Sequence, residues 1–443
     1  MNTMTKRFYQ LPVFWCMLFF VFSIILARHN KIGIYDQGYG RSWYNGDAFS
    51  DINVESAAKY YQEYGLRKNN GLPTYRYTDS IAGNEFVYTH YPPMAEWIGG
   101  IFAKITKHHD FKTLSFPVLF ISLALFFLIY YILSVWLKND IGAFIGASLL
   151  VLSNYFIPWA DDIHQHIYVE FFRWIFVYGW WLYLSSEKKK ILLIYALALS
   201  YAMMCFFSFE PYVYTAIIIV GFPIALKKRI VRWEVALLLA VPLVCFGLRL
   251  WLSSQYLGSF SAMLNDMTLA YKHRTGSDDR WSEIGRAMSF WDYIQLLPET
   301  RLHRLGHFYL FPSFVVIGLA ILGLIDLRNK YNQIYRVAIV IYLASISWML
   351  VMPQHALIHI FTLRHIGIFM GLTLGLGIVS FIKHIKAHWN KKDYLFLSID
   401  VIVIIYSLTY FAINTVYFLY MKYGWFYPQF GTDNFELTNY FLW

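Results

Sequence analysis

The chain has 443 residues, of which 58% are hydrophobic and only 14% are charged, and its formal net charge is +10. Ordinary soluble domains contain about 25% charged residues, so this composition excludes a disordered chain, a disulfide scaffold and a typical cytosolic enzyme. Many apolar runs exceed about 17 residues, the length that crosses a bilayer. The sequence therefore predicts an all-α polytopic membrane protein.

The first apolar run extends from about 8 to 27 and follows Lys6 and Arg7. It is longer than the apolar region of a cleaved signal peptide, so we expect an uncleaved first span. Further apolar runs bring the expected bundle to about eleven transmembrane helices. These further runs lie at about 114–137, 141–160, 167–185, 191–209, 211–226, 233–253, 307–325, 337–353, 360–382 and 394–420.

The topology depends on the segment 92–107. Its apolar run contains Glu96 and is short for a span. One apolar stripe recurs at helical spacing and consists of Met94, Trp97, Ile98, Ile101 and Ile105. With Lys104 and Lys107 on the polar side, the pattern favours an amphipathic helix that lies on the membrane surface.

The basic residues support this interpretation. If the N-terminus lies inside and 92–107 stays on the surface, the basic clusters fall in short inner loops. These clusters are Lys138, 188–190, 227–232, 328–336 and 383–392. A span at 92–107 would move them outside, against the positive-inside rule. We therefore expect a multi-pass protein of the cytoplasmic (inner) membrane with its active site on the outer, periplasmic face.

Two long segments then lie on the outer face, at 28–112 and 254–306, and both are rich in polar, charged and aromatic residues. Long ordered loops in a compact protein are usually functional. We divide the chain into a catalytic membrane module at 1–253, which includes the outer loop 28–112, a second outer loop at 254–306, and C-terminal transmembrane helices with an outer tail at 307–443.

The first outer loop contains an amphipathic helix followed by a proline pair. In 46–66, apolar residues repeat at helical spacing, Ser50 suits an N-cap and Gly65 ends the helix. Asp47 and Asp51 therefore lie at or just before a helix N-terminus. The sequence YTHYPPMAEW follows at 88–97.

This order of elements resembles the C-type integral membrane glycosyltransferases (GT-C), in particular the polyprenyl-phosphate-sugar-dependent branch with the protein O-mannosyltransferases and the aminoarabinose transferase of lipid A. The resemblance covers about the first half of the chain. It implies a GT-C-like bundle and an aspartate as general base. By its spacing to Gly65, Asp51 matches best, and Asp47 is the alternative. The family often has Glu-Lys or His-His before the two prolines, where this chain has Thr89-His90-Tyr91.

The chemistry can also be argued directly. An acceptor hydroxyl loses a proton as it attacks the anomeric carbon of a lipid-linked sugar, and a nearby carboxylate can take that proton. The departing lipid phosphate needs cationic donors where its charge develops. Such an enzyme therefore requires an outer-face aspartate, outer-face Arg and His groups, and an apolar groove for the lipid.

Further polar groups are expected near the same face. Asp161 and Asp162 end one span, and Glu210 lies at the turn between two others. With His90, these are candidates for substrate binding, although a solvated loop or a turn residue that reaches water would show the same pattern. Asp and His are both metal ligands, but the spacing matches no closed zinc pattern. We expect no cofactor; a divalent metal is possible but not favoured.

Cationic residues before two of the later spans are candidates for the lipid phosphate. Arg301 and Arg304 share a helix face at i, i+3, and the segment 352–371 supplies histidines and an arginine. Anchoring at the interface is the simpler alternative. The candidate phosphate ligands are Arg301, Arg304, His355, His359, Arg364 and His365.

The sequence thus predicts a glycosyltransferase that moves a hexose or pentose from a polyprenyl-phosphate donor to a lipid, glycan or protein acceptor. The alternative is a transporter or flippase of a lipid-linked saccharide, for which polar residues at mid-span and an internal repeat would be typical. Membrane lipids are expected partners and nucleic acid is not, because the basic residues lie between apolar runs.

Overall fold

In this computed structural model, the described residues are 48–75, 86–153, 155–186, 191–228, 232–275, 289–297, 304–309, 311–358 and 360–420, with individual residues between 15 and 23. Almost all of them are helical. The strands among them are the short antiparallel pair β1 (Thr74–Tyr75) and β2 (Phe86–Val87). The prediction of an all-α fold is confirmed.

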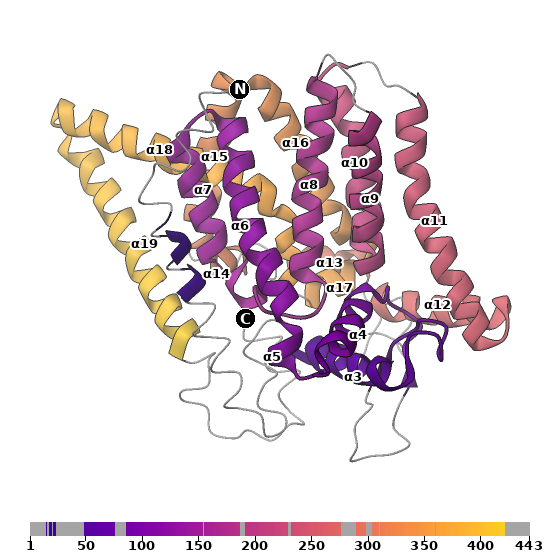
Figure 1. The fold of residues 1–443 in the computed structure, drawn as a ribbon. Coiled ribbons are helices and arrows are strands. Elements are labelled where there is room, and N and C mark those ends of the chain that lie inside the picture. The colour runs from indigo at the N-terminus through magenta and orange to yellow at the C-terminus, as the bar shows by residue number, and fades with distance from the viewer. Residues whose placement is uncertain are drawn as a thin grey trace.

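Apolar helices form the bundle in Figure 1 and follow the predicted runs. They are α6 (Phe116–Leu137), α7 (Asp140–Leu152), α8 (His166–Ser185), α9 (Ile191–Phe207), α10 (Glu210–Ala225), α11 (Arg232–Leu257), α15 (Ser313–Lys330), α16 (Asn332–Val351), α18 (Gly367–Lys391) and α19 (Tyr394–Tyr420). Among the described residues, four stretches are long and apolar enough to cross a membrane, namely Phe111–Leu137, Trp233–Leu257, Asn332–Val351 and Thr362–Lys391. The membrane-protein class is therefore confirmed, while the number of about eleven spans stays a prediction, and the first run lies largely outside the described residues.

Helix α18 is the centre of the C-terminal half because glycines let it approach its neighbours closely. A Cβ on Gly375 would meet the backbone of Gly142 in α7, and one on Gly377 would meet the backbone of Leu319 in α15. Small residues at such crossings are typical of membrane helices, where packing rather than the hydrophobic effect drives association.

One predicted span is shorter than expected. Helix α7 ends at Leu152 rather than near 160, because the Ser153 hydroxyl bonds to the backbone on both sides, donating to the Leu150 carbonyl (2.8 Å) and accepting from the Tyr155 N–H (3.1 Å). Such local side-chain bonds compete with the helix. A turn and the 3₁₀ helix η3 (Ile157–Trp159) follow, and this irregular segment carries part of the candidate site.

Short helices from both outer loops gather at one end of the bundle (Figure 1). Those of the first loop are α3 (Ala48–Tyr64), α4 (Met94–Thr106) and α5 (Phe111–Leu114). Later segments contribute α12 (Phe260–Thr275), α13 (Phe290–Leu297), α14 (Arg304–Tyr309), α17 (Pro353–Ile358) and the 3₁₀ helix η6 (Ile360–Ile366). We call this the loop end; the basic connections after α15 and α18 lie at the other end.

Helix α4 packs on α3 at the loop end and does not run among the long helices (Figure 1). It buries its small residues: a Cβ on Gly100 would lie 2.7 Å from the Tyr61 ring, which leaves no room for a side chain. From the predicted apolar stripe, Ile101 and Ile105 stay 50% and 72% exposed. The rest of the stripe, Met94, Trp97 and Ile98, is half-buried against the protein core, so only the C-terminal part of α4 offers an apolar surface to a membrane.

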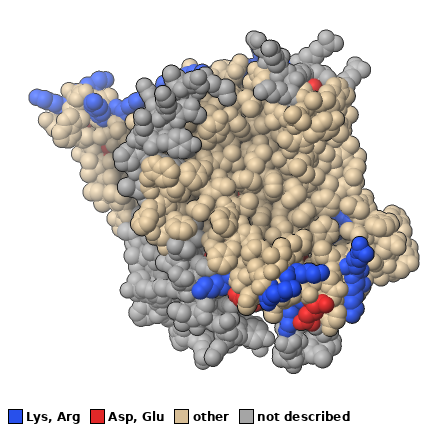
Figure 2. Space-filling view, in the orientation of Figure 1, with Lys and Arg blue, Asp and Glu red and all other residues tan. Residues whose placement is uncertain are grey.

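The surface follows the same two-ended pattern. Figure 2 shows a broad band of uncharged side chains across the middle of the molecule, with Lys and Arg above and below it. A membrane belt has this appearance, since charged side chains are costly at bilayer depth.

Candidate active site

Two carboxylates from distant parts of the chain converge on one backbone amide at the loop end. Asp51 lies in the first turn of α3, which begins at Ala48, earlier than the predicted cap at Ser50. The His164 N–H lies 3.3 Å from Asp51 Oδ1 and 2.9 Å from Asp162 Oδ1. Both aspartates are buried, as is Asp161. This concentration of negative charge suits a site that takes up a proton or a cation.

The segment around His164 is held by aromatic packing. The His164 ring stacks on Tyr91, which directly precedes the proline pair, with centroids 5.8 Å apart. The Tyr91 hydroxyl donates to Gln165 Oε1 and lies 2.9 Å from Ser208 Oγ. His166 packs against Trp159 at 4.3 Å. The two predicted motifs, around the prolines and around Asp161–Asp162, are therefore parts of one structure.

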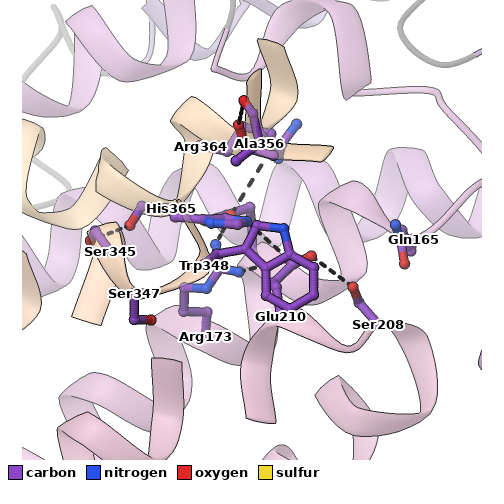
Figure 3. A network of polar contacts seen from close by, with 12 residues as sticks. Gln165, Arg173, Ser208, Glu210, Ser345, Ser347, Trp348, Ala356, Arg364 and His365 are labelled. Atoms are coloured by element: carbon purple, nitrogen blue, oxygen red, sulfur yellow. Dashed lines mark hydrogen bonds and ion pairs between the residues drawn. The ribbon is translucent and has the colours of Figure 1, made fainter. Parts of the chain in front are cut away.

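A chain of buried ionic contacts continues from there into the bundle (Figure 3). Ser208 Oγ donates to Glu210 Oε2 (2.7 Å), and Arg173 Nη2 donates to Glu210 Oε1 (2.9 Å). Arg173 Nη1 also donates to Glu170, and His365 Nε2 lies 3.4 Å from Glu210 Oε1. Buried charges of opposite sign offset one another's desolvation only when they are paired in this way.

Arg364 lies beside this network and is 2% exposed. Its Nε is 3.9 Å from Glu170 Oε1, and its guanidinium lies 5.3 Å from the ring centres of both Tyr155 and Trp159. Its Nη1 and Nη2 have no hydrogen-bond partner among the described residues. A buried guanidinium that keeps two donor nitrogens for another group is suited to bind an anion. Trp159 also connects Arg364 to the segment of Asp161 and Asp162.

The second outer loop anchors the first. Asp266 in α12 accepts from Thr89 Oγ1 (2.5 Å) and lies 2.7 Å from His90 Nε2. Arg249 in α11 donates to the Thr89 carbonyl (2.7 Å). His90 therefore faces Asp266, while its neighbour Tyr91 packs on His164 and bonds to Gln165, and the segment 89–91 is fixed from both sides.

The predicted site residues are thus partly brought together. Asp51, Asp161, Asp162, Glu210, Arg364 and His365 belong to one connected region. His355 lies beyond it, where it accepts from Trp348 Nε1 (3.3 Å). Asp47, Arg301 and His359, as well as the side chain of Arg304, lie outside the described residues, so the proposed convergence of these cations remains a prediction.

Several residues of this region were not singled out from the sequence. Arg173 forms an i, i+3 pair with Glu170 inside the apolar helix α8, and two ionisable groups within a predicted span are themselves a signal of function. Arg249 lies inside the predicted span 233–253 and carried the same signal, whereas Asp266 gave none, because its partners in 89–90 lie far away in the sequence.

No cluster of three or more His, Cys, Asp or Glu residues in the described part of the chain has the arrangement of a metal site. Asp51 and Asp162 are the acidic pair around which a divalent cation would be sought. The expectation of no cofactor stays a prediction.

Comparison with known proteins finds solved structures with a similar fold. No family model matches the sequence, and no curated protein matches it. The apo structure of the oligosaccharyltransferase from Archaeoglobus fulgidus matches with a TM-score of 0.55 at 10% identity, over 95% of this chain and 56% of that one. The oligosaccharyltransferase AglB from the same organism, in complex with an inhibitory peptide and a dolichol-phosphate, gives 0.51 at 11% identity over the same shares. The chain thus spans about half the length of these enzymes. The chain therefore shares the fold of these oligosaccharyltransferases, in agreement with the predicted GT-C-like bundle, while the polyprenyl-phosphate-sugar-dependent branch stays a prediction.

Proposed function

We propose that this protein is a glycosyltransferase that moves a hexose or pentose from a polyprenyl-phosphate donor to an acceptor hydroxyl. The observation that carries the proposal is the buried Arg364 guanidinium, two of whose nitrogens have no hydrogen-bond partner in the described part of the chain, beside Trp159 in a segment rich in buried carboxylates. A GT-C fold with an anion-binding group and a base in one region has the parts that the reaction needs. We place the proposed site on the outer face of the cytoplasmic membrane, which the positive-inside pattern of the basic loops favours.

In the proposed step, the acceptor oxygen attacks the anomeric carbon and the bond from that carbon to the phosphate oxygen breaks. The acceptor proton passes to a carboxylate, for which Asp51 is the first candidate and Asp47 the second. The bonding electrons leave with the polyprenyl phosphate. Atoms and charge balance without a redox partner, and the protein supplies a base and a cationic site for the leaving group.

Arg364 is the proposed phosphate ligand. Its planar fork of donors matches two phosphate oxygens at once, and burial strengthens the interaction because little water competes. The structurally similar AglB was solved in complex with a dolichol-phosphate. That ligand is a lipid phosphate of the same chemical class, which supports a lipid-phosphate site in this fold. His365 and the pair of Arg173 and Glu210 hold the surrounding backbone and charge in place.

Besides the proposed base, two further carboxylates, Asp161 and Asp162, bind the sugar or the acceptor. Asp162 shares the His164 amide with Asp51, so a hydroxyl near one carboxylate lies within reach of the other. Glu210 contacts Arg173, His365 and Ser208 instead, and we therefore assign it to positioning rather than to direct substrate binding.

The test is turnover of a polyprenyl-phosphate sugar by the purified full chain and its Asp51→Asn variant. We expect a loss of about 10²–10⁴-fold in the variant, with donor binding retained because the amide keeps shape and hydrogen bonding. Asp140→Asn is the matched control, since Asp140 also lies in the first turn of a helix, α7, and is exposed away from the site.

Three outcomes would redirect the proposal. Full activity in Asp51→Asn with loss in Asp47→Asn would transfer the base to Asp47. Full activity in both would move it to Asp161 or Asp162. Movement of the intact lipid-linked sugar across vesicles without any transfer would indicate a flippase and overturn the enzyme assignment.

A further inference from the structure

A cleft of about 320 Å³ opens at the C-terminal end of α3, outside the candidate active site. It lies between four segments: the end of α3 with the turn that follows, β1, β2, and the end of α11. The residues used below are Tyr60, Tyr64, Lys68, Asn69, Thr74, Phe86 and Tyr256.

Exposed aromatic rings dominate the cleft. Tyr64, Phe86 and Tyr256 are 46%, 42% and 41% exposed, each from a different segment. Tyr60 is buried beneath them, with its ring 4.9 Å from that of Tyr64. Aromatic faces turned to solvent around one hollow are costly unless something covers them, since a soluble surface seldom gathers large apolar groups at one spot.

Polar groups lie between the rings. The Lys68 ammonium sits 4.0 Å from the centre of the Tyr64 ring, and Asn69 Nδ2 donates to Thr74 Oγ1 (2.7 Å), both of which line the cleft. Ammonium, amide and hydroxyl groups together supply donors and acceptors at the edges of the aromatic faces.

The turn that carries these groups is rigid. Gly65 and Gly71 have φ values of +76° and +79°, which favour glycine. The Gly71 carbonyl accepts from both the Tyr61 hydroxyl (2.9 Å) and Trp97 Nε1 (2.6 Å), so the turn is fixed to α3 and α4 together. A preformed cleft binds with less loss of conformational freedom than one that must order on binding.

We propose that this cleft binds a saccharide, as part of the acceptor. A pyranose ring has faces of C–H groups, which pack on electron-rich aromatic faces, and a rim of hydroxyls, which Lys68, Asn69 and Thr74 can bond. A lipid chain would need a continuous apolar lining, and the polar groups interrupt it. The inference rests on the proposed function and adds the chemical class of the acceptor.

The position of the cleft also limits the size of that acceptor. Asp51 and Tyr64 are at opposite ends of α3, about 20 Å apart along its axis at about 1.5 Å per residue. A single sugar cannot reach both places. We therefore infer an oligosaccharide acceptor, whose terminal hydroxyl reacts near Asp51 while more distant units rest in the cleft.

The experiment measures binding of the purified full chain to a printed panel of linear hexasaccharides: malto-, cello-, chito- and mannohexaose, with unrelated peptides as a second class. We expect at least one hexasaccharide to bind, and Tyr64→Ala and Tyr256→Ala each to weaken it about tenfold, the effect of losing one aromatic contact. Tyr271→Ala is the matched control, because Tyr271 is 52% exposed on α12 at the same end but does not line the cleft.

The inference is overturned if no hexasaccharide binds, if peptides bind instead, or if Tyr271→Ala weakens binding as much as Tyr64→Ala. Donor hydrolysis, with water as acceptor, separates this inference from the proposed function. Donor hydrolysis without saccharide binding would support the glycosyltransferase proposal and overturn the saccharide-binding role of the cleft. Saccharide binding without any donor turnover would overturn the proposed enzyme function but support the cleft as a saccharide-binding site.

Discussion

Arg364 has the surroundings that we expect of the proposed phosphate ligand. Its Nε faces Glu170, its planar group lies beside two aromatic rings, and its two outer nitrogens are left without a bond to described residues. An unsatisfied buried donor costs about 1–3 kcal/mol, more when charged. A folded chain retains such a group where binding or catalysis uses it.

Replacing Arg364 by lysine tests the planar fork rather than the charge. Lysine keeps the positive charge but cannot bind two phosphate oxygens in one plane. We expect Arg364→Lys to lower turnover of a polyprenyl-phosphate sugar about 10²–10³-fold and to weaken binding of the free polyprenyl phosphate. Arg328→Lys, on the exposed last turn of α15, should leave both unchanged. Equal effects of the two variants would exclude Arg364 as the phosphate ligand.

At the scale of elements, α12 and α4 determine how the first outer loop sits on the bundle. Helix α12 holds 89–90 through Asp266, and α4 is fixed to β1 because the Tyr75 hydroxyl donates to Glu96 Oε1 at 2.5 Å. Each contact adds to others between the same parts of the chain, namely Arg249 with Thr89 and Trp97 with Gly71. Each can be loosened by one substitution.

Asp266→Ala should release the segment before the proline pair. Thr89 and His90 lose a shared acceptor, and we expect faster amide hydrogen exchange in the peptide 86–93 with little change in α8. We expect kcat/KM to fall mainly through a higher KM. The stacked rings of Tyr91 and His164 would no longer be held in one position, whereas the proposed base, Asp51, remains. Asp326→Ala, at the opposite end in α15, is the control. Unchanged exchange in 86–93 would show that Asp266 does not anchor the loop.

Glu96 makes the stability of the α3–α4 pair depend on pH. Burial raises the pKa of Glu96 from 4.5 to about 7, against the hydrogen bond from Tyr75, which lowers it. Because the folded pKa is the higher one, folding favours the protonated form. The stabilisation is therefore fully present below about pH 4.5 and is lost as the pH rises to about 7; the shift corresponds to roughly 3 kcal/mol.

Hydrogen exchange of α4 measured across that pH window, after correction for intrinsic rates, should show protection falling as the pH rises. Glu96→Gln, which cannot ionise, should flatten the profile, whereas Glu63→Gln on the exposed side of α3 should not. A wild-type profile already flat between about pH 4.5 and 7 would contradict this account.

At the scale of the whole molecule, the two ends of the bundle differ in what they carry. The loop end gathers the short helices, the carboxylates and Arg364, and the other end gathers the basic connections after α15 and α18 (Figure 1). By the positive-inside rule we expect the loop end to face outward, and the proposed site would then lie where a lipid-linked sugar meets an exported acceptor.

Cysteine labelling tests this sidedness. We expect His108→Cys, just after α4, to react with a membrane-impermeant thiol reagent applied to intact cells, and Lys386→Cys in the last turns of α18 to react only after permeabilisation. Both native positions are exposed, and the described native cysteines are buried, so background labelling is low. The opposite pattern would invert the topology and move the site to the cytoplasmic face.

The helices and the membrane-protein class could be predicted from the sequence alone, because hydropathy and periodicity are local properties. The apolar runs became α6 to α11, α15, α16, α18 and α19, Gly65 ended α3 at Tyr64, and 94–106 became a helix on the end of the bundle. The predicted bounds were wrong at helix ends. Helix α7 ends early, for example, because the Ser153 hydroxyl bonds to the backbone, and such side-chain bonds decide where a helix stops.

Only the tertiary structure decided which side chains meet. Asp51 reaches His164 across 113 residues, and His90 reaches Asp266 across 176. Such contacts depend on how the helices cross and which rotamers fit, and no short-range pattern encodes that. The same reason explains why His90 faced Asp266 rather than the carboxylates around His164, and why the pairing of Arg173 with Glu210 could not be predicted before α8 and α10 were packed together.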